Sequence, residues 1–261
     1  MSIDARSYWS ATKHPWACVL FVLPLLAIYE IGLYVNGNAA PDMLRNGADA
    51  WLRAALSEVG ISPVYGAPCL LVVVLLMWGF WQREDRPLDN VGVWVGIAAE
   101  SAVFALVLLG LSQGMWHVLV RADTVFGQPS HRIAALLQLS AESSRSPEWI
   151  WGHLVSYLGA GIYEETLFRL LLYAGLVKLF SWGQPSISFN TFMLAAFSSA
   201  LLFAGAHHVG PNGDPFNVYV LAFRTFAGLY FAWLYHARGF GIAVGAHAGY
   251  DVLVGLILQR G

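Results

Sequence analysis

Charged residues are scarce in this 261-residue chain. Only 11% of the residues are charged and 57% are hydrophobic, whereas charged residues make up roughly a quarter of an ordinary globular protein. The scarcity excludes a conventional soluble domain and indicates that lipid is the solvent for much of the chain.

Clustered positive charge is also absent. The 14 lysine and arginine residues are scattered along the sequence, and the formal net charge is −2. Nucleic-acid binding is therefore excluded, because it requires a basic patch or stripe. Cysteine is equally rare: Cys18 and Cys69 both lie in apolar runs without a paired spacing. This excludes a disulfide framework and a CxxC site, and both thiols are expected to be small buried hydrophobes.

The sequence has neither a signal-peptide cleavage pattern nor an evident internal repeat. Residues 1–16 precede a long apolar run without a small-residue cleavage site, so we expect this run to be a retained span. The two matching halves that are typical of many transporters are not evident either.

Long apolar runs are abundant. A helix needs about 20 mostly apolar residues to cross a bilayer, and such runs lie at about 15–35, 64–82, 91–112, 190–207, 217–236 and 240–258. A further stretch at 149–181 is long for one span, and Gly159-Ala160-Gly161 is expected to divide it into two helical segments. The predicted fold class is therefore all-α, a polytopic transmembrane bundle of roughly seven or eight spans.

Two sizeable polar segments, 36–63 and 113–148, interrupt these runs. Their mixed charge and scattered apolar residues indicate short amphipathic or interfacial helices rather than a soluble domain. We therefore divide the chain into transmembrane helices with polar loops, residues 1–148, and a carboxyl-terminal transmembrane core, residues 149–261, which carries the most conspicuous intramembrane charges.

Two adjacent carboxylates and an arginine lie in the segment YEETLFR at 163–169. Such residues inside membrane helices cost at least ~2.5–3.5 kcal/mol on insertion scales and so mark functional sites. On a helix Glu165 and Arg169 are about 40° apart in azimuth, whereas Glu164 and Arg169 are about 140° apart. Arg169 is therefore predicted to pair with Glu165 and to leave Glu164 free as a general base. A cluster that only fixes helix register is the alternative.

Two histidine-containing elements follow in later apolar runs. His207 ends the run that begins at Phe203, where it is either a proton donor and acceptor or an interfacial residue. His247 and Asp251 are four residues apart on one helical face, and a self-satisfied pair that packs the bundle is the alternative. Charged groups in a membrane protein must find one another or water. The three elements are therefore predicted to converge on one water-filled pocket.

The order of these motifs resembles that of the CAAX-protease and bacteriocin-processing family, also called CPBP or Abi. The family motifs EExxxR, FxxxH and HxxxN/D correspond to Glu164-Glu165-xxx-Arg169, Phe203-xxx-His207 and His247-xxx-Asp251. The resemblance extends over roughly residues 150–258. It implies a helical fold, an active site recessed below the membrane surface, and an endopeptidase that forms no covalent acyl-enzyme.

The resemblance also implies a role for each polar residue. Glu164 looks like the carboxylate that activates water, and His207 looks like its partner in positioning or proton transfer. His247 and Asp251 would bind the developing oxyanion, a task for preorganised donors. Many relatives have Asn in place of Asp251. Because an ionised carboxylate would repel an oxyanion, Asp251 must be protonated, must orient His247 or must act in another way.

Three other functions stay open. A small transporter or channel would also use intramembrane Glu, Arg and His, and an inactive family member would serve as an immunity or scaffolding protein. A zinc protease would bind its metal through a set of ligands of acceptable type: Glu164, His207, His247 and Asp251. The sequence has no HExxH and shows no evident second-shell partner for each histidine. We therefore expect no metal and no other cofactor.

The expected partners follow from the same resemblance. They are membrane lipid and a membrane-associated protein or peptide substrate, such as a prenylated C-terminal tail, a bacteriocin leader or a membrane-anchored sorting tail. The expected location is a bacterial inner membrane. Arg224, in the run 217–236, is expected either to pack or snorkel, or to line a substrate channel or pair with Asp251.

Overall fold

A computed structural model describes most of the chain. The described residues are 5–35, 44–81, 90–126, 146–182, 186, 188–210 and 213–257. In chain order the helices are α1 (Ala5–Lys13), α2 (Pro15–Val35), α3 (Gly47–Glu58), α4 (Pro63–Trp81), α5 (Asn90–Phe126), α7 (Pro147–Glu165), the π-helix η3 (Thr166–Tyr173), α8 (Ala174–Phe180), α9 (Phe189–Ala206), α10 (Val218–Arg238), α11 (Phe240–Val252) and the π-helix η4 (Leu253–Ile257).

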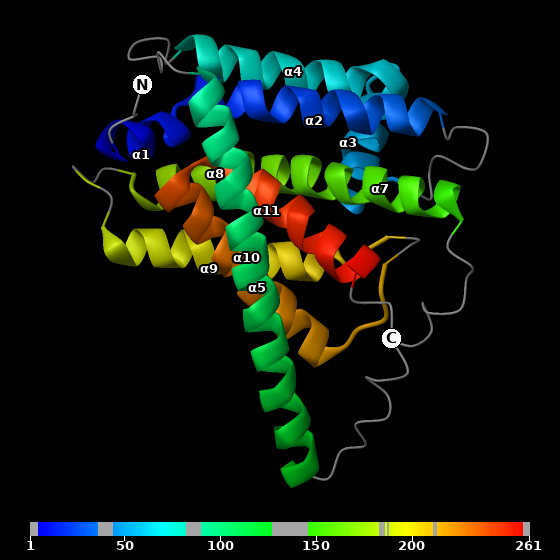
Figure 1. The fold of residues 1–261 in the computed structure, drawn as a ribbon, viewed down its shortest axis with the longest axis vertical. Coiled ribbons are helices and arrows are strands. Elements are labelled where there is room, and N and C mark those ends of the chain that lie inside the picture. The colour runs from blue at the N-terminus through cyan, green and yellow to red at the C-terminus, as the bar shows by residue number, and fades with distance from the viewer. Residues whose placement is uncertain are drawn as a thin grey trace.

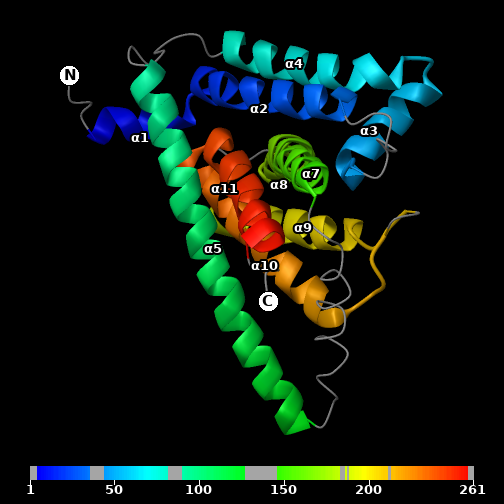
Figure 2. The same cartoon turned by 45° about the vertical axis from the view of Figure 1, so that its right-hand side comes forward.

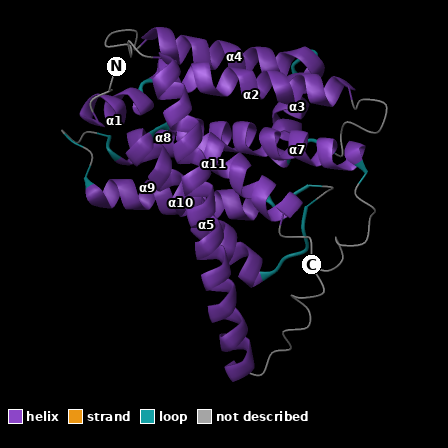
Figure 3. Ribbon diagram, in the orientation of Figure 1, coloured by secondary structure: helices purple, strands orange, loops and turns teal. Residues whose placement is uncertain are grey.

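The predicted all-α bundle is confirmed. Figure 3 shows helices and loops, and no strand, in the part of the chain that the structure describes. Five helices are long and apolar enough to cross a membrane: α2, α4, residues 91–115 of α5, α9 and α10. The run 240–256 is a shorter apolar helix. The protein is therefore a polytopic membrane protein of helical type.

Helix α5 extends further than the sequence predicts. The predicted span ends near residue 112, but the helix continues to Phe126. The reason is that the first strong helix-breaking signal, Gly127-Gln128-Pro129, lies beyond that point. The predicted polar segment 113–148 is thus helical in its first part, while residues 127–145 lie outside the described residues. In the other predicted polar segment, 36–63, a short helix does form: α3.

The predicted break at Gly159–Gly161 is wrong. Helix α7 runs through both glycines, and the backbone changes instead to a π-helix at Thr166. Both glycines serve close packing. A Cβ on Gly159 would overlap the ring of Tyr29 in α2, and one on Gly161 would lie 2.8 Å from the carbonyl oxygen of Val244 in α11. The glycines therefore bring neighbouring helices together rather than bending their own helix.

Helices α7 and α11 lie at the centre of the bundle. Helix α11 packs against α5, α7 and α10, and α7 packs against α2 and α3 as well. In Figure 1, α2 and α4 form a layer on one side of α7 and α9 lies on the other, and Figure 2 shows α7 nearly end-on between them. The long helix α5 runs across the direction of α2 and α4 (Figure 1). Helices from both halves of the sequence thus enclose α7.

Local sequence signals set the helix ends near the centre. Ser146 caps α7 by accepting a hydrogen bond from the backbone of Trp149, and Pro147 follows at the first helical position. Asn217 caps α10 in the same way. Between α10 and α11, Gly239 has φ +101°, and a Cβ there would lie 2.6 Å from the carbonyl oxygen of Thr12. Glycine therefore permits the tight corner that turns α11 back into the bundle.

A buried polar network joins α2, α3 and α7 and reaches Tyr163, the residue before Glu164. Asp49, fully buried, accepts hydrogen bonds from Tyr29 (2.7 Å) and from Arg53 Nε (2.7 Å). Arg53 also contacts both carboxylate oxygens of Glu30, which accepts a further hydrogen bond from Tyr163 (2.7 Å). Each buried charge is thus paired, as a low-dielectric interior requires.

The two cysteines differ in exposure. Cys18 is buried and lies 3.4 Å from the backbone nitrogen of Gly241, as expected for a small core residue. Cys69 is exposed on α4, contrary to the prediction. An apolar run does not distinguish a core-facing position from a lipid-facing one, because both faces of a membrane helix are apolar.

The contact between α7 and α11 leads to a stability prediction. Gly161→Ala should lower the free energy of unfolding by about 1–3 kcal/mol, because the added methyl group meets backbone and Cβ atoms of α11 at 2.8–2.9 Å and overpacks the contact. Gly175→Ala is the matched control, since nothing lies within 4 Å of its added Cβ. Thermal unfolding of both variants in detergent is the measurement. Equal stability of the two variants would contradict this close packing.

Candidate active site

The polar residues of the three motifs come from four helical segments. Glu164 and Glu165 end α7, and Arg169 lies in η3. His207 follows the last residue of α9. His247 and Asp251 lie in α11. Their side chains form one connected cluster, which we call the EHHD cluster and define by Glu164, His207, His247 and Asp251, supported by Glu165 and Arg169.

Glu165 is fully buried beneath this cluster. One of its oxygens, Oε1, lies 2.7 Å from Nδ1 of His247, and the other, Oε2, lies 3.2 Å from Nε of Arg169. The second contact has the distance of an ion pair without the alignment of a hydrogen bond. A buried carboxylate is costly unless it is paired. Glu165 therefore fixes the position of both neighbours, on α11 and on η3.

Arg169 is enclosed by groups from α9 and α10. Its NH2 donates a hydrogen bond to the carbonyl oxygen of Gly228 (3.2 Å). Its guanidinium carbon lies 4.4 Å from the ring centre of Phe203 and 5.5 Å from that of Phe231. Cation–π contacts of this kind strengthen when water is excluded. They hold the cation beside Glu165.

Glu164 has a different environment although it is adjacent in sequence. Its oxygen Oε2 is buried and has no hydrogen-bond partner. That oxygen lies 3.8 Å from Nε2 of His207 and 3.8 Å from Nε2 of His247. Both separations are longer than a hydrogen bond, so neither imidazole is hydrogen-bonded to this oxygen. The carboxylate is thus buried, unpaired by a cation and faced by two imidazoles.

Both imidazoles are held through Nδ1, so that Nε2 faces Glu164. His207 Nδ1 contacts the carbonyl oxygen of Phe203 one turn earlier (2.8 Å), as His247 Nδ1 contacts Glu165. His247 also stacks on the ring of Phe231, with ring centres 4.5 Å apart and planes 13° apart. Such contacts fix ring orientation and tautomer.

Asp251 lies at the more exposed side of the cluster. Its Oδ2 is 3.6 Å from Nε2 of His247, the same nitrogen that faces Glu164, and a quarter of its side chain is exposed. Arg224 does not pair with it. Arg224 instead contacts Asp214 at 2.6 Å.

Two further residues contribute to the cluster and are not recognisable from the sequence. Phe231, which stacks on His247, and Gly228, which accepts from Arg169, both lie on α10. Gly228 also allows α9 to approach, because a Cβ there would lie 2.9 Å from the Cα of Ala200. An apolar residue and a glycine inside an apolar run carry no signal of their own, so only the three-dimensional arrangement identifies them.

The π-helix η3 begins directly after the two carboxylates. Ser199 of α9 donates a hydrogen bond to the carbonyl oxygen of Phe168 (2.6 Å), and Thr166 donates one to Ile162 (2.7 Å). Side chains thus satisfy backbone carbonyls where the helical hydrogen-bond pattern changes. π-Helical segments occur frequently at functional sites, and this one carries Arg169.

The histidine environments correct one argument from the sequence. A partner for each histidine was not evident there, but Glu165 and the Phe203 carbonyl are such partners. Within the described ranges, however, no group of three or more His, Cys, Asp and Glu side chains is arranged so that it could hold a metal ion.

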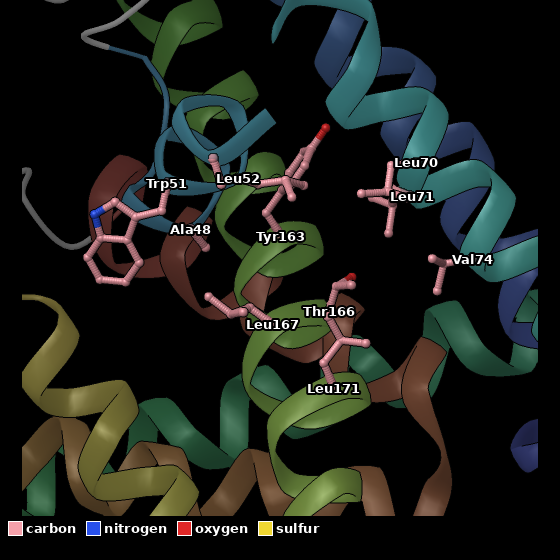
Figure 4. Close-up of a pocket in the computed structure, with 11 residues that line it drawn as sticks. Ala48, Trp51, Leu52, Leu70, Leu71, Val74, Tyr163, Thr166, Leu167 and Leu171 are labelled. Atoms are coloured by element: carbon pink, nitrogen blue, oxygen red, sulfur yellow. The ribbon is translucent and has the colours of Figure 1, made fainter. Parts of the chain in front are cut away.

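An apolar cavity of about 340 Å³ lies beside the cluster, between α3, α4 and the α7–η3 run. In Figure 4, Trp51 and Leu52 line it from α3, Leu71 from α4, and Tyr163 and Leu167 from the motif-bearing run. Its lining is almost entirely apolar. It contains none of the residues of the EHHD cluster.

Comparison with known proteins agrees with the motifs. Residues 146–253 match the sequence model of the family described as type II CAAX prenyl endopeptidase Rce1-like. This range contains Glu164, Glu165, Arg169 and the entire EHHD cluster. No curated protein and no solved structure matches the chain. The predicted resemblance to the CAAX-protease family is thus confirmed over residues 146–253 of this integral membrane protein.

Proposed function

We propose that the protein hydrolyses peptide bonds of membrane-associated or lipid-anchored proteins with a water molecule that Glu164 activates. The observation that carries the proposal is the position of Glu164 Oε2, which is buried, without a hydrogen-bond partner, and 3.8 Å from Nε2 of two different histidines. A general base needs an acceptor atom within reach of its proton donor and a defined place for the water. Glu164 supplies the acceptor atom, and the two imidazoles border the place proposed for the water.

The adjacent carboxylates of Glu164 and Glu165 have different roles. Glu165 forms an ion pair with Arg169 and a hydrogen bond with His247, so taking a proton from water would neutralise the anion on which both contacts depend. Glu164 faces the space between the imidazoles and accepts that proton as the water attacks the peptide carbonyl. The proton then passes to the leaving amine, as general acid–base catalysis requires.

The remaining members of the EHHD cluster act on the water and the oxyanion. His207 positions the water or transfers its proton. A doubly protonated His247 donates Nδ1–H to Glu165 and directs Nε2–H at the developing oxyanion, where a preorganised donor lowers the barrier. Asp251, 3.6 Å from that nitrogen, orients the imidazole when ionised and becomes a second donor when protonated.

The substrate class follows from the setting. The cluster lies within a bundle of membrane helices, and the apolar cavity beside it suits a hydrocarbon chain. The family name adds prenylated CAAX proteins as a substrate type. We therefore propose substrates anchored in the membrane by lipid or by an apolar segment, processed in a bacterial inner membrane.

Glu164→Gln should abolish cleavage of a farnesylated peptide that ends in a CAAX sequence, or of a bacteriocin leader peptide. The amide keeps the size of the side chain but cannot accept the proton, and loss of a general base costs about 10²–10⁴ in rate. Rates are measured in bilayer nanodiscs. Expression and thermal stability should stay close to those of the unaltered protein, because Glu164 Oε2 has no protein partner to lose.

Glu148→Gln is the matched control, since Glu148 lies on the same helix but is exposed at its amino-terminal end. It should leave cleavage unchanged. A Glu164→Gln variant that keeps more than about a tenth of the activity would refute the general-base role. Cleavage of neither peptide by the unaltered protein would favour the inactive immunity or scaffolding member as the alternative.

Glutamate-type hydrolysis predicts independence from transition metals. Purified active protein should contain far less than one equivalent of zinc, measured by elemental analysis, and should keep its rate after prolonged treatment with a strong zinc chelator. The opposite outcome is zinc near one equivalent, with zinc and activity both lost on chelation and both restored when zinc is added. That outcome would establish a zinc protease, whose ligands would be those of the EHHD cluster.

A further inference from the structure

Arg224 is the charged residue near the EHHD cluster that the proposed mechanism does not use. It lies in the second turn of α10 and is about a quarter exposed. Its charge interacts electrostatically with Glu164, His207 and Asp251. Among the ion pairs of the described residues, however, it contacts only Asp214.

Asp214 is itself held firmly beside His207. Its backbone nitrogen donates to the carbonyl oxygen of His207 (2.8 Å), and its own carbonyl oxygen contacts Nδ1 of His208 (2.9 Å). Its carboxylate contacts NH2 of Arg224 at 2.6 Å. Asp214 therefore fixes the guanidinium at the border of the cluster. The position of Asp214 is in turn set by His207, the residue that follows α9.

This arrangement occupies only part of the guanidinium. NH1 of Arg224 is buried and has no hydrogen-bond partner. A buried donor without a partner is unfavourable, and a bound substrate group would satisfy it. Among the groups of a peptide, a carboxylate is the one whose two oxygens best match the planar fork of an arginine. The free nitrogen is thus suited to an anionic group of the substrate.

The contacts of Asp214 limit where that group lies. Its carboxylate contacts Arg224, and its backbone nitrogen donates to the carbonyl oxygen of His207, so Arg224 lies at the border of the EHHD cluster. We propose that Arg224 binds a carboxylate of the substrate, either its terminal carboxylate or an acidic side chain, close to the bond that is cut.

This inference rests on the proposed function, and it makes Arg224 a specificity-determining residue. The test uses a peptide that the unaltered protein cleaves and the Glu164→Gln variant does not. Two matched pairs are compared in nanodiscs by kcat/KM. The first pair carries a free terminal carboxyl or a terminal amide, and the second carries Asp or Asn at a position close to the cleaved bond.

The unaltered protein should prefer the carboxylate form in at least one pair by about ten- to a hundredfold, as expected for a hydrogen bond to a charged group. The pair that shows the preference identifies the source of the carboxylate. Arg224→Gln should reduce that preference to near one, and Arg224→Lys should keep part of it, because a lysine keeps the charge without the fork. Asp214→Asn should retain it.

Lys178→Gln removes an exposed positive charge on α8 and is the matched control, which should change no preference. Equal cleavage of both forms in both pairs by the unaltered protein would overturn the inference and leave the proposed function intact. If Arg224→Gln and Asp214→Asn both lower kcat/KM by the same factor for every peptide, the pair only holds the loop against α10 and the inference is overturned. If the proposed function itself is wrong, the Glu164→Gln variant cleaves the peptides as fast as the unaltered protein does.

Discussion

The double contact of Glu165 organises the candidate active site. This fully buried carboxylate contacts His247 of α11 at 2.7 Å and Arg169 of η3 at 3.2 Å. In a membrane bundle such a charge is tolerated only when it is paired and packed. Rings from α9 and α10 complete the enclosure of Arg169. One buried anion on α7 thus contacts α11 and η3 directly, is linked to α9 and α10 through Arg169, and turns Nε2 of His247 toward Glu164.

Close packing makes this geometry possible. The cluster needs α7 and α11 near one another, and Gly161 permits that by placing its Cα against the backbone of α11. Gly228 has the same effect between α10 and α9. Small residues are the usual means of close approach in membranes, where burial of apolar surface gives little driving force between helices. Polar chemistry and small-residue packing are therefore parts of one arrangement.

The sequence predicted the helical bundle and most spans well, because apolar runs of the length of a bilayer have few alternative structures. It placed the break of the 149–181 run at Gly159–Gly161, since glycine weakens a helix, whereas those glycines serve packing and the irregularity is a π-helix that no composition rule predicts. Motif order identified the residues of the EHHD cluster as candidates. Phe231 and the Asp214–Arg224 pair could not be found that way, because their roles depend on which helix faces are neighbours.

The most direct test of the central claim, that Glu164 makes this bundle a protease, is to sequence the termini of membrane proteins in the host. Cells that carry the unaltered protein are compared with cells that carry the Glu164→Gln variant at equal abundance. The account predicts a set of membrane-anchored proteins whose termini are shortened in the first cells and full-length in the second. Identical termini in both would contradict it.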